Sequence, residues 1–384
     1  MTLKRSMQPK YRRRRQLAVA LALALTLLLV GISGYVWYQR SVVGQRDYEG
    51  AGNGTVVMVK VGEGDSLSSI APTLVEKKIV GSRRALMREA EARDASLQTG
   101  YYPLQEKMSA SAALDALTDD ANRRGAVDIP TGLPLEDVTV VGGKTREGIY
   151  SLISAQTCSS EDECISSDTL REAVVSSTPE ELEVPQWAKG AVADRADDPR
   201  RIEGLISPGV HLFDPTSTPQ EIMRELISNS AAEYEATGLL KAAEAVGLSP
   251  YEMITAASLV EREAPAGDFD KVARVILNRL KEDQRLEFDS TVNYDVDEQE
   301  VATTDSDRAR RTPWNTYAKK GLPETPIASP GIQALQAMEH PAEGDWLYFV
   351  TINKDGETVF NRDFDAHEAA IEKARANGVL DSAR

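Results

Sequence analysis

Two glutamates at the end of one apolar stretch are the residues best placed for chemistry in this chain. The stretch begins as a capped helix, because Ser249 can accept a hydrogen bond from the backbone of Glu252, whose side chain can reach back to Ser249. A helix formed by residues 253–260 would be apolar or small on nearly every side, which indicates a helix buried within the protein. Glu261 and Glu263 close this helix.

The two carboxylates differ in their expected surroundings. Residues two apart on a helix lie about 200° apart, so Glu261 and Glu263 face nearly opposite sides. Glu263 follows Leu259 and Val260 at helical spacing. A carboxyl among apolar neighbours at a helix C-terminus is disfavoured as an anion, which raises its pKa and suits a general acid. The alternative is that the helix leaves the core here and its last turn is solvated.

The charge distribution argues against two classes of partner. Nine of the 44 basic residues precede position 47, where no acidic residue occurs, so the remaining chain carries 35 basic and 60 acidic residues. Such an acidic body is a poor partner for nucleic acid and for anionic lipid surfaces.

The N-terminal segment predicts a single-pass membrane anchor. Residues 17–38 form a run of 22 positions without a charge, enough to cross a bilayer core of about 30 Å. Seven basic residues precede this run, so we expect a cytoplasmic basic tail at 1–16, an extracytoplasmic remainder and residence in the cell membrane. A cleaved signal peptide is the alternative, but its apolar core would be shorter. The glycine-rich residues 39–54 are typical of a flexible linker.

Residues 55–122 predict a small unit of mixed α and β structure. A β-branched strand at 55–61 precedes Gly-Asp-Ser-Leu-Ser-Ser-Ile-Ala, in which the glycines turn the chain and Asp65 or Ser66 can cap a helix. These elements resemble the opening of a LysM module, a small fold that binds glycans containing N-acetylglucosamine. The resemblance ends after the first helix, so a glycan-binding role and a spacer role both remain open for this unit.

A larger α+β domain is expected at 135–384. Residues 156–200 are rich in Ser, Asp, Glu and Pro without a clear period, and we expect them to form an exposed, variable insertion. The chain's two cysteines, Cys158 and Cys164, fall within it. In an oxidising compartment they are expected to form a disulfide, which would stabilise only locally because the loop is short.

We expect no metal and no cofactor. The cysteines have no histidine near them, the three histidines are scattered, and no His-Glu-x-x-His motif occurs. His211 and His340 are expected at the surface, and His367 is expected to brace a C-terminal strand pair.

The loops that follow the helix of Glu261 and Glu263 predict a sugar-binding groove. They follow an amphipathic helix at 271–280 and combine Asn, Thr, Asp and aromatic residues with rigid Pro and Gly. Fixed amides and hydroxyls can pair with sugar hydroxyls, and aromatic faces can cover the C–H sides of a sugar. The loops occupy residues 286–294, 312–317, 321–323 and 326–331.

In these segments the chain resembles the endolytic murein transglycosylases of the YceG-like (MltG) family. The resemblance rests on Ala-Ser-Leu-Val-Glu-Arg-Glu at 257–263, Asn-Arg-Leu at 278–280, and the blocks 289–294, 315–330 and 347–367. It implies a LysM-like unit followed by a lytic transglycosylase domain. It also implies cofactor-free cleavage of MurNAc–GlcNAc bonds within nascent peptidoglycan strands, which limits glycan length, with peptidoglycan synthases such as penicillin-binding proteins as partners.

The resemblance also implies the site residues. The catalytic glutamate of the family is the second acid of the Glu-x-Glu pair, here Glu263, and the first is given a supporting role. The residues expected to line or brace the substrate cleft are Glu261, Asn278, Asp289, Thr291, Tyr294, Asn315 and Tyr317. The chain departs from the family at 203–211. Many relatives have Glu-Gly-x-x-x-Pro-Asp-Thr-Tyr there, whereas this chain has Glu-Gly-Leu-Ile-Ser-Pro-Gly-Val-His.

The implied reaction uses one carboxyl twice. Protonated Glu263 donates to the glycosidic oxygen, and the carboxylate then takes the proton of the MurNAc C6 hydroxyl, which attacks C1 and closes a 1,6-anhydro ring. A hydrolase ordinarily needs a second carboxylate across the sugar, and Glu261 faces away from that position. A muramidase-type hydrolase and a non-catalytic, membrane-tethered glycan-binding scaffold remain as alternatives.

Overall fold

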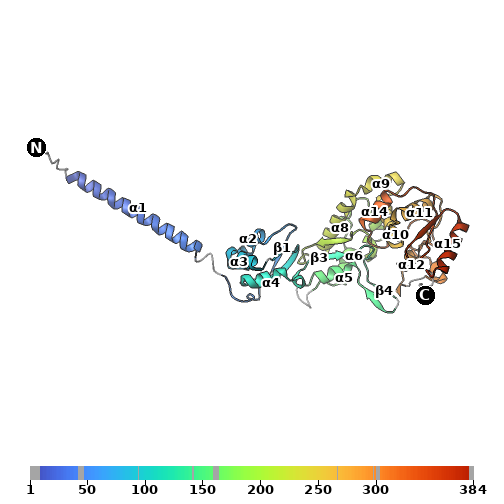
Figure 1. The fold of residues 1–384 in the computed structure, drawn as a ribbon, viewed down its shortest axis with the longest axis horizontal. Helices are drawn as coiled ribbons and strands as arrows, with labels where there is room; N and C mark the ends of the chain where they lie inside the picture. The colour runs from blue at the N-terminus through green and yellow to red at the C-terminus, as the bar shows by residue number, and fades with distance from the viewer. Residues whose placement is uncertain are drawn as a thin grey trace. The chain divides into compact units, whose positions relative to one another are not determined.

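The computed structural model shows a chain of mixed α and β structure, as the sequence predicted (Figure 1). It forms two compact units, residues 1–123 and 124–384. The residues described are 9–41, 47–93, 95–140, 142–158, 164–265, 267–296, 298–299 and 303–379.

A long apolar helix opens the first unit. Helix α1 (Pro9–Ser41) contains the span Arg14–Trp37, which is long and apolar enough to cross a membrane and is not covered by protein. Leaving so many apolar side chains in water would be costly, so this helix suits a lipid environment. The expected basic tail at 1–16 and linker at 39–54 lie partly outside the described residues.

The rest of the first unit packs three helices on a two-stranded antiparallel sheet. Ser66, one of the two predicted caps, caps α2 through a capping box with Ser69, and the helix buries Leu67, Ile70, Ala71 and Leu74. The strand predicted at 55–61 is also confirmed, because β1 pairs with β2 along its whole length. The elements are β1 (Val56–Val61), α2 (Leu67–Glu76), α3 (Arg83–Arg93), β2 (Gly100–Gln105), α4 (Ala110–Thr118) and the 3-10 turn η2 (Asp120–Asn122).

In its described residues, the second unit combines helices with three small sheets. Strands β3 and β6 pair antiparallel, β4 lies between β5 and β7, and β8 pairs antiparallel with β9. The first half contains β3 (Ala126–Ile129), β4 (Val138–Val140), β5 (Lys144–Arg146), α5 (Ile149–Gln156), α6 (Ser167–Ser176), α7 (Lys189–Asp194), the 3-10 turn η3 (Pro199–Ile202), β6 (Gly209–Leu212), α8 (Pro219–Ala236) and α9 (Leu239–Val246). The second half contains α10 (Pro250–Glu263), α11 (Phe269–Lys281), α12 (Asp289–Asn293), β7 (Glu298–Gln299), α13 (Asp305–Ala309), α14 (Ile332–Glu339), β8 (Tyr348–Thr351), β9 (Thr358–Asn361) and α15 (Phe364–Ala376).

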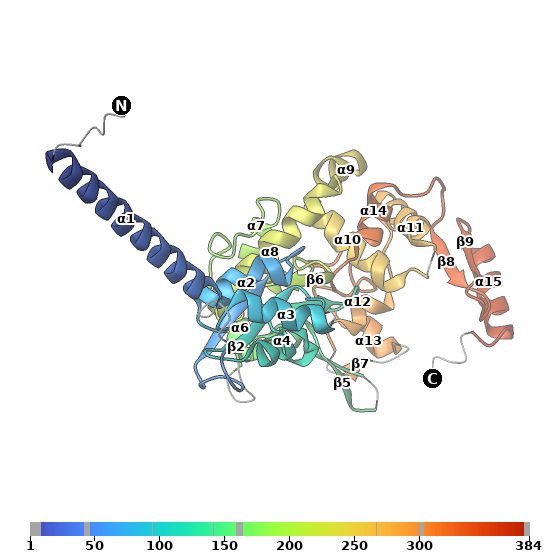
Figure 2. The same cartoon turned by 60° about the vertical axis from the view of Figure 1, so that its left-hand side comes forward.

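Helix α10 is the central element of the second unit. The predicted capping box is present: the Glu252 N–H donates to Ser249 Oγ at 3.2 Å, and the Ser249 N–H donates to Glu252 Oε2 at 2.7 Å. Every residue from Met253 to Val260 is buried. Helices α9, α11, α12 and α14 pack around α10, which Figure 2 shows beside α11 and α14. This packing fixes the end of α10, and therefore the position of Glu263.

The expectation that residues 156–200 are exposed is wrong for the described part of that segment. Helix α6 buries Leu170 and Val174 completely, and both belong to the core that α5 and α8 also form. These two residues are four apart, so an apolar helix face was present among the polar residues around it. Cys158 and Cys164 are joined by a disulfide, with their Cα atoms 4.1 Å apart.

One histidine is not where the sequence suggested. His211 on β6 is buried and its Nε2 donates to the carbonyl of Ser207 at 2.6 Å, so the expectation of a surface position is wrong. The strand pairing of β6 with β3 turns this side chain inward. His340 is exposed, as expected.

Candidate active site

Glu263 borders a cavity at the end of α10. The cavity has a volume of about 320 Å³, within the range of small-molecule sites in proteins. Its walls come from α11, from the start of α12, from β8 and from α15. The other lining residues are Arg279, Glu287, Phe288, Asp289, Tyr317, Tyr348, Phe349, Phe364, His367 and Ile371.

The environment of Glu263 favours its protonated form. Burial raises the pKa of the Glu263 carboxyl above its ordinary value, and the nearby negative charge of Asp289 acts in the same direction. Ser290 and Arg262 oppose this effect by stabilising the carboxylate. The Ser290 N–H donates to Glu263 Oε1 at 3.1 Å. The expectation of a raised pKa is therefore confirmed.

Asp289 belongs to a separate polar cluster beside Glu263. Its Oδ1 accepts hydrogen bonds from the hydroxyl of Tyr317 at 2.8 Å and from that of Thr303 at 2.6 Å. Arg308 donates to both of its carboxylate oxygens at 3.1 Å and lies over the ring of Tyr317. Because these partners hold the carboxylate, Asp289 is a fixed charge rather than a free nucleophile.

Glu261 points to another part of the fold. Its Oε2 accepts a hydrogen bond from the N–H of Gly331 at 3.0 Å. Gly331 is the N-terminal cap of α14, where a carboxylate is also favoured by the helix dipole. Glu261 is therefore placed to anchor α14 against α10, outside the lining of the cavity.

Asn278 and Asn315 also bind backbone outside the cavity lining. Asn278 Nδ2 donates to the carbonyls of Gly344 at 3.2 Å and Trp346 at 2.8 Å, which holds the segment before β8. Asn315 Nδ2 donates to the carbonyl of Arg308 at 3.0 Å, and its Oδ1 accepts from the N–H of Tyr317 at 2.9 Å. Asn315 thus orders two residues that contact Asp289.

Thr291 and Tyr294 hold helix α12 by its two ends. The hydroxyl of Thr291 donates to the carbonyl of Phe288 at 2.6 Å and lies 2.9 Å from that of Thr316. The hydroxyl of Tyr294 donates to Glu203 Oε2 at 2.8 Å. Of the eight residues expected at the site, the structure brings Glu263, Asp289 and Tyr317 into the cavity. Asn278, Thr291, Tyr294 and Asn315 contact segments that form or adjoin its walls, whereas Glu261 contacts α14, away from the cavity.

Similarity to known proteins extends over most of the chain. Residues 59–373 match the model of the YceG-like family. The chain belongs to the YceG-like family. The family that the sequence motifs indicated is therefore confirmed.

Named relatives and a solved structure are also similar to most of this chain. The endolytic murein transglycosylase of Bacillus subtilis (strain 168) is 28% identical over 330 residues, covering 83% of this chain and 85% of the relative. That of Streptococcus pneumoniae (strain D39) is 24% identical over 357 residues, covering 89% of this chain but 62% of the relative. The crystal structure of a YceG-like protein from Listeria monocytogenes has a TM-score of 0.54 and 23% identity, covers 82% of this chain and 98% of that chain, and shares the fold.

In this YceG-like chain, sequence reasoning missed one cationic residue of the cavity. Arg279 is buried, donates to the carbonyl of Leu347 at 2.6 Å, and lies over the rings of Tyr348 and Phe288. It follows Val272 by seven residues, so it falls on the buried face of α11, where a charged side chain is a signal of function. Among the described residues, no group of His, Cys, Asp and Glu side chains is arranged to hold a metal ion.

Proposed function

We propose that this protein is a lytic transglycosylase that cleaves MurNAc–GlcNAc bonds within peptidoglycan strands and leaves 1,6-anhydro-MurNAc ends. The observation that carries the proposal is a half-buried carboxyl with a raised pKa, Glu263, at a cavity of suitable size. Membership of the YceG-like family supports the same reaction.

The proposed reaction needs one acid that also serves as a base. Protonated Glu263 gives its proton to the glycosidic oxygen as the bond from C1 breaks, and the Ser290 N–H stabilises the carboxylate that forms. This carboxylate then accepts the proton of the MurNAc C6 hydroxyl, whose oxygen bonds to C1. The enzyme ends in its initial state, and no water is consumed.

The surroundings of Glu263 favour this route over hydrolysis. A hydrolase needs a second carboxylate that is free to activate water or to attack C1. Asp289 is near, but Tyr317, Thr303 and Arg308 occupy its oxygens. We assign Asp289 and Tyr317 to substrate contact, and Glu261, Asn278, Thr291, Tyr294 and Asn315 to bracing the cleft.

The remaining parts of the chain have proposed roles in placing this reaction. The apolar span in α1 would anchor the protein with its N-terminus in the cytoplasm, and the sheet and helices at 55–122 would form a LysM-like unit. A tethered enzyme reaches strands close to the membrane, where new glycan emerges. We therefore propose that residues 135–384 cleave nascent strands and limit their length, with a peptidoglycan synthase as partner.

The end groups of the products test the reaction type. Purified glycan strands incubated with the full-length chain in detergent should yield shorter fragments with 1,6-anhydro-MurNAc ends, as measured by mass spectrometry. Reducing ends would instead identify a muramidase-type hydrolase, and binding without cleavage would identify a scaffold.

The rate of cleavage should depend on pH through Glu263. Because the reaction starts from the protonated acid, the rate should fall as the pH rises through the raised pKa of Glu263. Asp289→Asn removes the Asp289 charge, which is one cause of that raised pKa. The high-pH limb of the pH–rate profile, in which the rate falls, should therefore move to lower pH. The pH profile of the cleavage rate of both proteins measures this; a limb that moves to higher pH would contradict it.

A further inference from the structure

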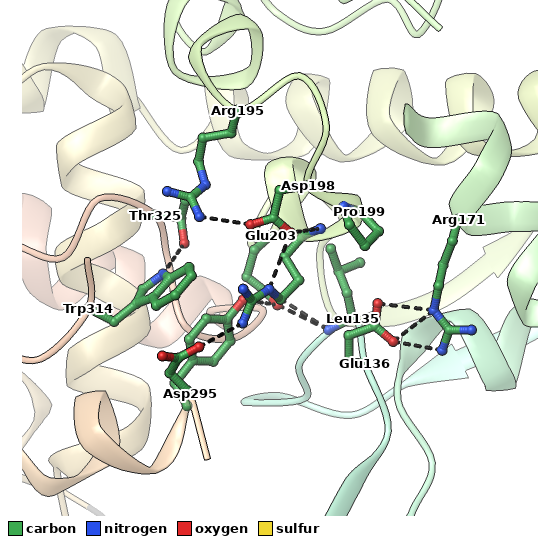
Figure 3. A network of polar contacts seen from close by, with 12 residues as sticks. Leu135, Glu136, Arg171, Arg195, Asp198, Pro199, Glu203, Asp295, Trp314 and Thr325 are labelled. Carbon is green, nitrogen blue, oxygen red and sulfur yellow. Dashed lines mark hydrogen bonds and ion pairs between the residues drawn. The ribbon is translucent and has the colours of Figure 1, made fainter. Parts of the chain in front are cut away.

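A fully buried carboxyl accepts a hydrogen bond from the residue that caps helix α12. Glu203 follows η3 and has no exposed surface. The Leu135 N–H lies 3.2 Å from each of its oxygens, and the hydroxyl of Tyr294 donates to Oε2 at 2.8 Å. The next residue, Gly204, has φ +74°, and an added Cβ there would lie 2.5 Å from Pro326, so only glycine fits at this position. Glu203 is thus a fixed acceptor, and Figure 3 shows it at the centre of a polar network.

Helix α12 connects this acceptor to Glu263. The helix has five residues, or about 7.5 Å of length. Its second residue, Ser290, donates its N–H to Glu263, and the residue that caps its C-terminus, Tyr294, donates its hydroxyl to Glu203. A helix of a single turn is not stable by itself. The position of the Ser290 N–H therefore depends on contacts that hold both ends of α12.

Tyr294 is held in one orientation by its neighbours. Its ring meets Trp314 edge-on, with ring centroids 5.2 Å apart, and the guanidinium of Arg200 lies over both rings. Arg200 in turn pairs with Asp198 and Asp295, each at 3.2 Å. Figure 3 draws both carboxylates in the same close-up as Glu203. The network leaves the hydroxyl of Tyr294 aimed at Glu203.

We propose that Glu203 and Tyr294 are positioning residues of the catalytic centre. Their hydrogen bond holds the C-terminal end of α12 and thereby keeps the Ser290 N–H against Glu263. The inference rests on the proposed role of Glu263 and assigns neither Glu203 nor Tyr294 a direct contact with substrate.

Tyr294→Phe tests the bond with the smallest change, because the ring and its packing remain. In the full-length chain in detergent, kcat for glycan cleavage should fall about 10-fold to 100-fold, as expected for a catalytic group that is displaced slightly, while KM changes little. The high-pH limb of the rate should also move to higher pH, since a weaker Ser290 N–H bond stabilises the carboxylate of Glu263 less.

Tyr102→Phe is the matched control. The hydroxyl of Tyr102, a buried residue of the first unit, donates to the carbonyl of Gln98 at 2.9 Å, so this variant also loses a tyrosine hydrogen bond, but one outside the network of Glu203 and α12. Both variants should lose similar thermal stability, and the control should keep the wild-type pH profile. If Tyr294→Phe loses stability but keeps both kcat and the wild-type limb, the positioning role is wrong.

A second pair of variants covers the case in which Tyr294→Phe fails to fold. Glu203→Ala removes the acceptor of the Tyr294 hydroxyl. Glu203→Gln keeps an acceptor oxygen on a side chain of the same length. The Gln variant should retain most of the wild-type kcat and the Ala variant should not; equal kcat values in the two would overturn the inference. Failure of the proposed function is a different result, in which the wild-type chain does not cleave glycan or Glu263→Gln cleaves it equally well.

Discussion

Replacing Glu263 by Gln should abolish glycan cleavage while leaving glycan binding intact. The amide has nearly the shape of the carboxyl but can neither donate a proton to the leaving oxygen nor take one from the C6 hydroxyl. General acid–base catalysis contributes about 10²-fold to 10⁴-fold, and one side chain performs both transfers here, so we expect a loss near the upper end of that range. Product release from purified strands measures it.

The control separates loss of chemistry from loss of fold. Glu244→Gln makes the same change at an exposed position of α9 and should leave the rate unchanged. The Glu263→Gln protein should unfold at the same temperature as the wild type or at a higher one, because a buried acid is replaced by a neutral group. Cleavage by Glu263→Gln at the wild-type rate would remove this residue from the mechanism.

The second large effect is on stability and depends on pH. Burial raises the pKa of Glu203 to about 8 from an ordinary 4.5, although Tyr294 and the N–H groups of Leu135 and Gly204 oppose the shift. The folded protein therefore holds this proton more tightly than the unfolded chain does. The resulting stabilisation is complete below about pH 4.5 and is lost as the pH rises through about 8, and amounts to at most about 5 kcal/mol.

Glu203→Gln should remove this pH dependence. The free energy of unfolding of the wild type should fall relative to that of the variant between about pH 5 and pH 8, because the amide does not titrate. Tryptophan fluorescence can follow the unfolding, since Trp187, Trp314 and Trp346 lie in the second unit. For the exposed Glu244→Gln variant, the free energy of unfolding should change with pH in the same way as that of the wild type. If the free energy of unfolding of the wild type also changes with pH in the same way as that of Glu203→Gln, Glu203 does not titrate in this range.

Local patterns determined several parts of this protein in advance. The capping box of Ser249 and Glu252 and the apolar run after it are contained within fifteen residues, and the structure has the helix that they predict. The apolar span in α1 depends on composition alone. The direction of the Glu263 pKa shift could be predicted from the apolar residues that precede it on the same helix, although Phe288 and Phe349 from distant segments also line its cavity.

Contacts between distant residues decided the rest. Tyr294 and Glu203 are 91 residues apart, and neither local spacing nor residue type indicates that the hydroxyl of one meets the carboxyl of the other. For Arg279 and the helix at 167–176, the spacing along the chain marks a helix face, but the segments that cover this face come only from tertiary packing. A capping motif or an apolar run is encoded by neighbours along the chain. The partner of a buried polar group depends on which distant segments meet, and that is decided by the tertiary structure.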